Sequence, residues 1–256
     1  MKQFEKGIYL LPNLMTTIAL FAGFYAVIAG MNGDYELGAI AIFVAMVFDG
    51  LDGRVARMTN SCSAFGAEYD SLADMISFGL APALLMYQWA LNDFSKLGWI
   101  VAFIYTVAAA LRLARFNTQV GTADKRYFQG LPSPAAAALL ASFVWMIETN
   151  DINTGFEAYI ALVFTLVVGL MMVSDIRFES FKELNLKGKV PFVTLLVVVL
   201  VLSVIALKPA LILFVLILAY IIYGPVLTLR LLQKKKALRK AQKNNQNKDD
   251  SDLSNK

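Results

Sequence analysis

Four aspartates lie close together in an otherwise apolar sequence: Asp49, Asp52, Asp70 and Asp74. On helices, Asp49 and Asp52 share one face because they are three residues apart, and Asp70 and Asp74 share another because they are four apart. Ionised carboxylates among membrane-length apolar runs are costly unless they are paired, hydrated or bound to a metal. Several carboxylates that converge on one space cannot all stay ionised without cations. The spacing therefore predicts a divalent-metal site between two helices.

Small residues accompany these aspartates. Gly53 and Ala56 extend the first acidic face, and Gly66 lies one helical turn before Asp70, so both faces leave room for a bulky ligand. Carboxylate oxygens suit Mg²⁺ or Mn²⁺, which in turn favour phosphate-bearing substrates. Arg57 is available for a phosphate oxygen. The simpler alternative is that the acids only flank a loop at the membrane edge. Four acids on two matched faces favour a site.

The residue types that are missing or rare restrict the chemistry. The chain contains no histidine, so acid–base and metal chemistry must use carboxylates. Its single cysteine, Cys62, excludes an internal disulfide. Cys62 stands beside the aspartates and could be a thiolate ligand, although an inert small residue is the preferred interpretation.

The elements that must position the aspartates are transmembrane helices. Hydrophobic residues make up 58% of the chain and charged residues 16%, and the mean hydropathy is +0.61. Soluble domains are less apolar and more charged. The composition predicts an all-α, polytopic transmembrane bundle of about eight spans. The predicted spans are residues 10–30, 36–48 (continuing as a helix to 57), 71–91, 97–113, 132–147, 156–173, 190–207 and 211–229.

The distribution of basic residues predicts the orientation of these spans. Alternate loops hold nearly all of the lysines and arginines, which places those loops and both termini in the cytoplasm. We expect an interfacial segment at 1–9, a transmembrane catalytic domain at 10–230, and a basic, partly disordered cytoplasmic tail at 231–256. The protein is thus expected in the cell membrane, with the aspartates facing the cytoplasm and without a nucleic-acid partner.

The aspartate stretch resembles the signature of the CDP-alcohol phosphatidyltransferases. It reads Asp49-x₂-Asp52-Gly53-x₂-Ala56-Arg57-x₈-Gly66-x₃-Asp70-x₃-Asp74, and every fixed position agrees. The resemblance implies that fold, with two divalent ions, Mg²⁺ or Mn²⁺, held on a CDP diphosphate. It implies that Asp49, Asp52 and Asp70 are metal ligands, and that Asp74 is a ligand and the base that deprotonates the acceptor hydroxyl. The CDP pocket would be lined by Asp52, Gly53, Ala56, Arg57 and Gly66.

Two later stretches look like those of the membrane-type phosphatidylserine synthases within that family. They are Arg112-Leu-Ala-Arg115-Phe116-Asn117 and Gly130-Leu-Pro-Ser133-Pro-Ala135. Arg112 and Arg115 could attract an acidic headgroup or the carboxylate of serine, with Asn117 and Ser133 as further candidates. The alternative is that both arginines only anchor the helix at the cytoplasmic side.

The resemblance implies an enzyme that transfers the phosphatidyl group from CDP-diacylglycerol to the hydroxyl of L-serine and releases CMP. It also implies a homodimer in contact with membrane lipids. Two alternatives remain: the same transfer to glycerol phosphate, inositol or another alcohol, and a cation-coupled transporter that uses intramembrane carboxylates. Transporters of that kind often carry inverted repeats and broken helices, which the sequence does not show.

Overall fold

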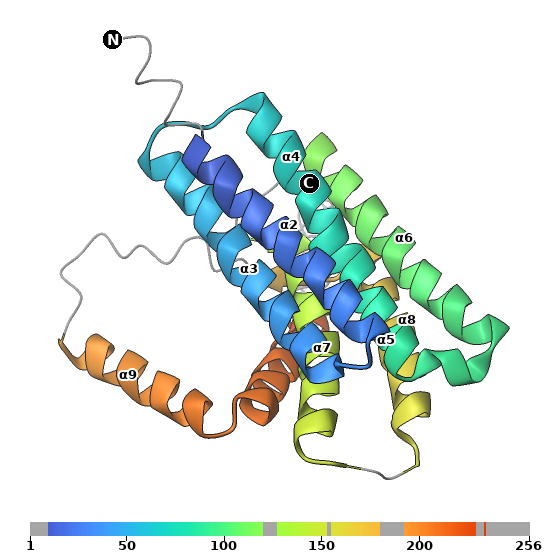
Figure 1. Ribbon diagram of the computed structural model, residues 1–256. Helices are drawn as coiled ribbons and strands as arrows, with labels where there is room; N and C mark the ends of the chain where they lie inside the picture. The colour runs from blue at the N-terminus through green and yellow to red at the C-terminus, as the bar shows by residue number, and fades with distance from the viewer. Residues whose placement is uncertain (1–9, 120–126, 153–154, 180–191, 229–232, 234–256) are drawn as a thin grey trace, which may run out of the picture.

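A computed structural model describes residues 10–119, 127–152, 155–179 and 192–228, together with Gln233. The predicted interfacial segment 1–9 lies outside the described residues, as does the predicted tail 231–256 apart from Gln233. The described chain forms a bundle of helices with one short pair of strands (Figure 1). The prediction of a helical bundle is confirmed, and the strands are an addition that the sequence did not indicate.

The first two helices form a tightly packed pair. α2 (Leu10–Met31) and α3 (Tyr35–Met58) are joined by a short turn in which Gly33 has a φ of 83°, a conformation that favours glycine. Small residues at intervals of three or four bring their backbones close, as is usual in membranes. The small buried residues of α2 are Ala19, Ala22, Gly23, Ala26, Ala29 and Gly30.

The next helical segment runs without a break through three consecutive helices. α4 (Ala64–Asp74) continues into a π-helix, η1 (Met75–Leu80), and then into α5 (Ala81–Trp89). Ser63 caps the start of α4, since its Oγ accepts a 3.0 Å hydrogen bond from the Gly66 amide. The helix therefore begins seven residues before the predicted span at 71, and Asp70 is already helical.

The remaining elements complete the bundle. A short 3₁₀ helix, η2 (Leu91–Phe94), leads into α6 (Lys96–Thr118), and α7 (Ser133–Thr149) and α8 (Glu157–Val173) follow. Strand β1 (Tyr127–Gln129) precedes α7 and pairs antiparallel with β2 (Arg177–Glu179), which follows α8. α9 (Phe192–Leu207) and a final helix, Pro209–Thr228, end the described chain.

α7 is the most enclosed helix of the bundle (Figure 1). Its residues from Ala136 to Val144 are all buried, so it is apolar around its whole circumference rather than along one stripe. Phe143 of α7 packs against aromatic rings from α5, α8 and the final helix, so α7 contacts helices from both earlier and later parts of the chain.

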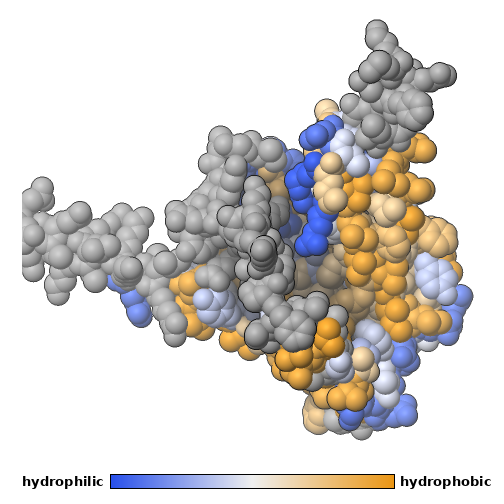
Figure 2. Space-filling model, turned by 90° about the vertical axis from the view of Figure 1, so that its left-hand side faces the viewer, coloured by the Kyte–Doolittle hydropathy of each residue, from blue (hydrophilic) through white to orange (hydrophobic). Residues whose placement is uncertain are grey.

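The outer faces of the helices are apolar, as lipid contact requires. Three described helices are long and apolar enough to cross a membrane: α2, α6 and Pro209–Thr228. α7 and α8 are apolar but shorter. Hydrophobic side chains cover much of the right-hand side of the view in Figure 2. These features make the chain an integral membrane protein, and each of the eight predicted spans has a helical counterpart.

Candidate functional site

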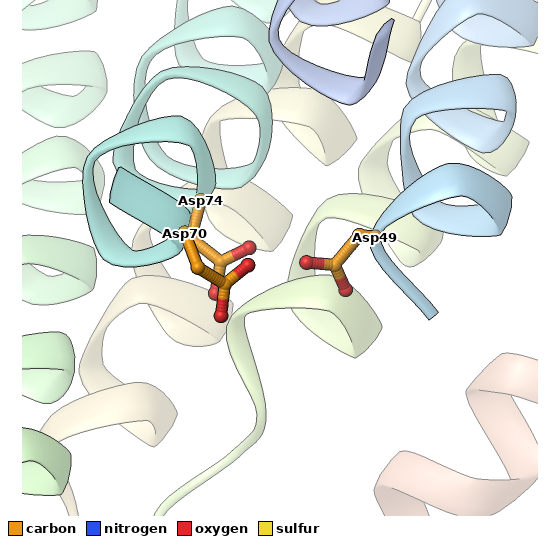
Figure 3. Close-up of side chains that lie close together, drawn as sticks. All are labelled: Asp49, Asp70 and Asp74. Atoms are coloured by element: carbon orange, nitrogen blue, oxygen red, sulfur yellow. The ribbon is translucent and has the colours of Figure 1, made fainter. Parts of the chain in front are cut away.

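Three of the four aspartates meet between α3 and α4. One carboxylate oxygen from each of Asp49, Asp70 and Asp74 lies within 4.8 Å of the other two. Figure 3 shows Asp49 on one helix facing Asp70 and Asp74 on another, with their carboxylates turned toward one another. Oδ1 of Asp70 is buried and has no hydrogen-bond partner among the described residues. An orphaned carboxylate oxygen beside two further carboxylates fits a divalent cation.

Asp52 joins this group from one turn further along α3. Its side chain is only 5% exposed, and its Oδ2 accepts a 2.7 Å hydrogen bond from Oγ1 of Thr16 on α2. It also interacts with Asp70. Burial raises the pKa of Asp52, while the hydrogen bond from Thr16 opposes that rise. Asp52 is thus held in place by the first helix while it faces the other acids.

The two acidic helices, α3 and α4, approach each other across α2. α2 packs against both α3 and α4, and it lies between them in Figure 1. The small residues of α2 let α3 approach closely on one side, and the segment from Thr59 to Ser63 carries the chain around to the other. The two acidic faces meet through their side chains rather than through their backbones.

Burial and electrostatic repulsion within the cluster both affect the pKa of Asp70. Burial raises the pKa of Asp70 to about 7, and the negative charges of Asp52 and Asp49 add to the effect. A carboxyl in this position holds its proton near neutral pH until a cation replaces it. This is the behaviour expected of a metal ligand in protein that lacks its ion.

A cavity of about 150 Å³ opens beside the cluster, between α2, α3 and α4. It contains every residue that the sequence predicts for the CDP pocket: Asp52, Gly53, Ala56, Arg57 and Gly66. The other lining residues are Pro12, Asn13, Thr16, Ser61, Cys62, Ser63, Ala67 and Asp70.

The two glycines keep this cavity open. A Cβ at Gly66 would lie 3.1 Å from Oγ of Ser63 and 3.4 Å from Oδ1 of Asn13. A Cβ at Gly53 would lie 3.4 Å from Nη1 of Arg57, so the guanidinium group leans over the glycine. The cavity therefore combines one cation, neutral polar groups and a carboxylate edge, which suits a ligand with a phosphate group.

The four residues predicted to bind serine or a headgroup fall in different places. Arg112 is 9% exposed, and its Nη1 donates a 2.9 Å hydrogen bond to Oγ of the fully buried Ser133. Arg115 instead lies 3.6 Å from Asp175, whose side chain is exposed, and Nδ2 of Asn117 donates to Ser71 at 3.0 Å. The structure brings Arg112 and Ser133 together and leaves the other two candidates in separate contacts.

Sequence reasoning missed the contribution of the first helix. Asn13 and Thr16 line the cavity, and Thr16 holds Asp52. Their signal was present: two polar residues three apart at the start of an apolar span occupy one helical face. Cys62 also lines the cavity and is exposed.

A family model described as CDP-alcohol phosphatidyltransferase matches residues 9–174. The chain belongs to the CDP-alcohol phosphatidyltransferase family. The matched region contains the acidic cluster, the cavity and Arg112, whereas β2, α9 and the final helix follow it.

Relatives of this phosphatidyltransferase carry more specific names. It is 36% identical, over 89% of its length and 94% of the relative's, to a CDP-diacylglycerol–serine O-phosphatidyltransferase of Helicobacter pylori. It is 38% identical, over 64% of its length and 75% of the relative's, to the protein of the same name from Methanocaldococcus jannaschii.

A solved structure shares the fold of this phosphatidyltransferase. Phosphatidylinositol phosphate synthase of Mycobacterium tuberculosis, with CDP-DAG bound, aligns with a TM-score of 0.53 at 16% identity. The alignment covers 67% of this chain and 88% of that chain.

Proposed function

We propose that this enzyme makes phosphatidylserine: it transfers the phosphatidyl group of CDP-diacylglycerol to the hydroxyl of L-serine and releases CMP. The observation that carries the proposal is the convergence of Asp49, Asp70 and Asp74 at the edge of the cavity that holds the other signature residues. The names of the Helicobacter and Methanocaldococcus relatives support serine as the acceptor.

The acidic residues supply the metal site in this proposal. Asp49, Asp52, Asp70 and Asp74 hold two divalent ions, Mg²⁺ or Mn²⁺, in the space where their carboxylates converge. When bound, such ions neutralise the diphosphate of the substrate and stabilise the charge that develops on the departing phosphate. Thr16 fixes the rotamer of Asp52 through its hydrogen bond.

The cavity binds the CDP part of the lipid substrate. Gly53, Ala56 and Gly66 provide the space, and the guanidinium of Arg57 donates to a phosphate oxygen. The acyl chains lie in the bilayer against the apolar outer faces of the helices. The protein thereby fixes the nucleotide and leaves the β-phosphate next to the acidic cluster.

Asp74 acts as the base. Its carboxylate takes the proton of the serine hydroxyl while the serine oxygen attacks the β-phosphorus. The bond between that phosphorus and the oxygen bridging to the α-phosphate breaks, and CMP leaves with the bridging oxygen. The absence of histidine from the chain leaves the carboxylates as the available bases.

The proposal extends to the setting of the enzyme. The eight helices cross the cell membrane, both termini lie in the cytoplasm, and the acidic cluster opens toward the cytoplasmic side, where serine and CMP are exchanged with water. Residues 10–230 form the catalytic domain, with the interfacial segment 1–9 before it and the basic tail 231–256 after it. As in similar enzymes, the active form is a homodimer.

The test is an acceptor assay with purified enzyme, CDP-diacylglycerol and Mn²⁺ or Mg²⁺. L-serine, glycerol phosphate and inositol are supplied in separate reactions, and CMP and the lipid product are measured. We expect serine-dependent CMP release that Asp74→Asn reduces at least about 1,000-fold. CMP release with another alcohol but not with serine would show that this alcohol, and not serine, is the acceptor. Metal-dependent uptake without CMP release would indicate a transporter.

A further inference from the structure

Arg112, a buried residue on α6, has no role in the proposed reaction so far. Arg112 is 91% buried, and its Nε has no hydrogen-bond partner among the described residues. Among the described residues, its Nη1 donates a hydrogen bond to the neutral hydroxyl of Ser133. A buried guanidinium that is not fully hydrogen-bonded is costly, so an anionic partner is expected on its open edge.

Arg112 is within electrostatic range of Asp74, at the reacting end of the site. It interacts electrostatically with Asp74, and also with Tyr105 on its own helix and Tyr220 on the final helix. In the unliganded protein Asp74 can serve as its counter-ion. Once Asp74 shares its charge with divalent cations, that compensation weakens, and a second anion beside Arg112 becomes favourable.

The position of Arg112 also separates it from the nucleotide. The described lining of the cavity comes from α2, α3, α4 and the turn before α4, and Arg112 on α6 is not part of it. The CDP phosphates therefore have Arg57 on their own side. Arg112 is therefore left for a small anion other than the CDP phosphates.

We propose that Arg112, held by Ser133, binds the carboxylate of the serine acceptor and places the serine hydroxyl at Asp74. The inference rests on the proposed function and deepens it by assigning the residue that distinguishes an amino acid from a simple alcohol. Free serine carries a carboxylate two bonds from the carbon that bears its hydroxyl. One molecule can therefore contact adjacent basic and acidic side chains at once.

The walls of this subsite come partly from outside the region that the family model matches. Tyr220 faces Arg112 from the final helix and packs against Phe178 of β2 at a ring-centroid distance of 5.8 Å. Phe178 is fully buried and sits against Gly224. Tyr220 on the final helix, and Phe178 of β2 behind it, thus lie on the Arg112 side of the site, and both follow the matched region, where this chain can differ from relatives that use other acceptors.

Arg115 provides a matched control on the same helix. It lies one turn from Arg112, carries the same charge and is 32% exposed. Its Nη1 also lacks a hydrogen-bond partner among the described residues, but, unlike Arg112, it has an acidic side chain, Asp175, 3.6 Å away. The variants are Arg112→Gln, Arg112→Lys, Arg115→Gln and Ser133→Ala. For each, kcat and KM are measured with L-serine and, as acceptors without a carboxylate, with ethanolamine and serinol. CDP binding in the presence of Mn²⁺ is measured by calorimetry as a check on folding.

We expect Arg112→Gln to raise the KM for L-serine roughly 30- to 1,000-fold, with the KM for CDP-diacylglycerol changed less than threefold. The preference for serine over ethanolamine should fall by a similar factor. Arg112→Lys should recover part of this preference for serine, and Ser133→Ala should lower the preference about tenfold. Arg115→Gln should stay within threefold of the parent. L-serine should raise the melting temperature of the parent with bound CDP and Mn²⁺, and not that of Arg112→Gln.

Two results would overturn the assignment. One is an Arg112→Gln enzyme that binds CDP normally and loses kcat equally with all acceptors, which would limit the arginine to supporting Asp74. The other is a raised KM for CDP-diacylglycerol with an unchanged KM for serine, which would assign Arg112 to the lipid phosphate. Failure of the parent enzyme to use serine would instead refute the proposed function. If Arg112→Gln does not fold, the KM values of Ser133→Ala and Arg112→Lys for L-serine and for CDP-diacylglycerol decide between these outcomes.

Discussion

Thr16 on the first helix donates a 2.7 Å hydrogen bond to the buried carboxylate of Asp52 on the second. Its Oγ1 also lies 3.1 Å from the carbonyl oxygen of Pro12, within reach of the same proton, so the side chain is held in one rotamer. The contact joins the first helix, which helps to line the cavity, to the helix that carries two of the acids. It is the kind of outer contact that orients a metal ligand.

Removing that contact should weaken metal binding. Thr16→Val keeps the shape of the side chain and removes the hydroxyl, so Asp52 loses a donor that favours its ionised form. We expect Mn²⁺ affinity to fall about 10-fold by calorimetry and Thr16→Ser to restore it. Thr17→Val is the control, because the exposed Thr17 bonds to Asn13 and Tyr69 and not to an acid of the cluster. Unchanged Mn²⁺ affinity in Thr16→Val would show that Asp52 is oriented without Thr16.

The space beside Arg57 should be sensitive to a single methyl group. Gly53→Ala places a Cβ 3.4 Å from the Arg57 guanidinium inside the cavity, whereas a Cβ at Gly50 on the same helix meets nothing within 4 Å. Both changes have the same intrinsic effect on helix stability, about 1 kcal/mol in favour of alanine. We expect Gly53→Ala to raise the KM for CDP-diacylglycerol about 10-fold and Gly50→Ala to leave it unchanged. Equal KM values for Gly53→Ala and Gly50→Ala would indicate that the nucleotide binds elsewhere.

Metal binding should depend on pH through Asp70. Its pKa is raised to about 7, so below pH 7 a cation must displace the proton of Asp70, and above pH 7 Asp70 has already lost it. We expect Mn²⁺ affinity to rise up to about tenfold per pH unit between pH 6 and 7 and to level off toward pH 8. Proton release, read from calorimetry in buffers of different ionisation enthalpy, should fall over the same range. Affinity that is flat from pH 6 to 8 would contradict the raised pKa of Asp70.

Cys62 offers a direct probe of the cavity. It is the only cysteine of the chain, it is exposed, and it lines the cavity with Arg57 and Gly66. N-ethylmaleimide should therefore modify a single site, and CDP with Mn²⁺ should slow that modification at least about fivefold because bound nucleotide covers the thiol. Mass spectrometry gives the rate, and Cys62→Ser should retain activity after the same treatment. Modification at the same rate with and without CDP would argue against nucleotide in this cavity.

The convergence of the aspartates could be predicted from the sequence because its information is local. Asp49 and Asp52, like Asp70 and Asp74, are one turn apart, and helical periodicity alone places each pair on one face. The long apolar runs likewise marked each helix to within a few residues, except that α4 begins at Ala64 because Ser63 caps it. Secondary structure set by composition and capping was accessible without coordinates.

What could not be predicted depends on contacts between distant segments. The π-helix after Asp74 accompanies a hydrogen bond from Tyr105 to the carbonyl of Phe78, and no local pattern announces it. The strands β1 and β2 are three residues long and lie about fifty residues apart, so neither carries a period that indicates pairing. Arg112 and Arg115 look equivalent in sequence, yet neighbouring helices bury the first and leave the second partly exposed.

The central claim is that the carboxylates of two helices share divalent cations, and crystallography of the enzyme with Mn²⁺ and CDP tests it most directly. The account predicts anomalous-scattering peaks between α3 and α4, with oxygens of Asp49, Asp70 and Asp74 about 2.0–2.3 Å from manganese. Manganese found only elsewhere on the protein, with the three carboxylates unliganded while CDP is bound, would contradict it.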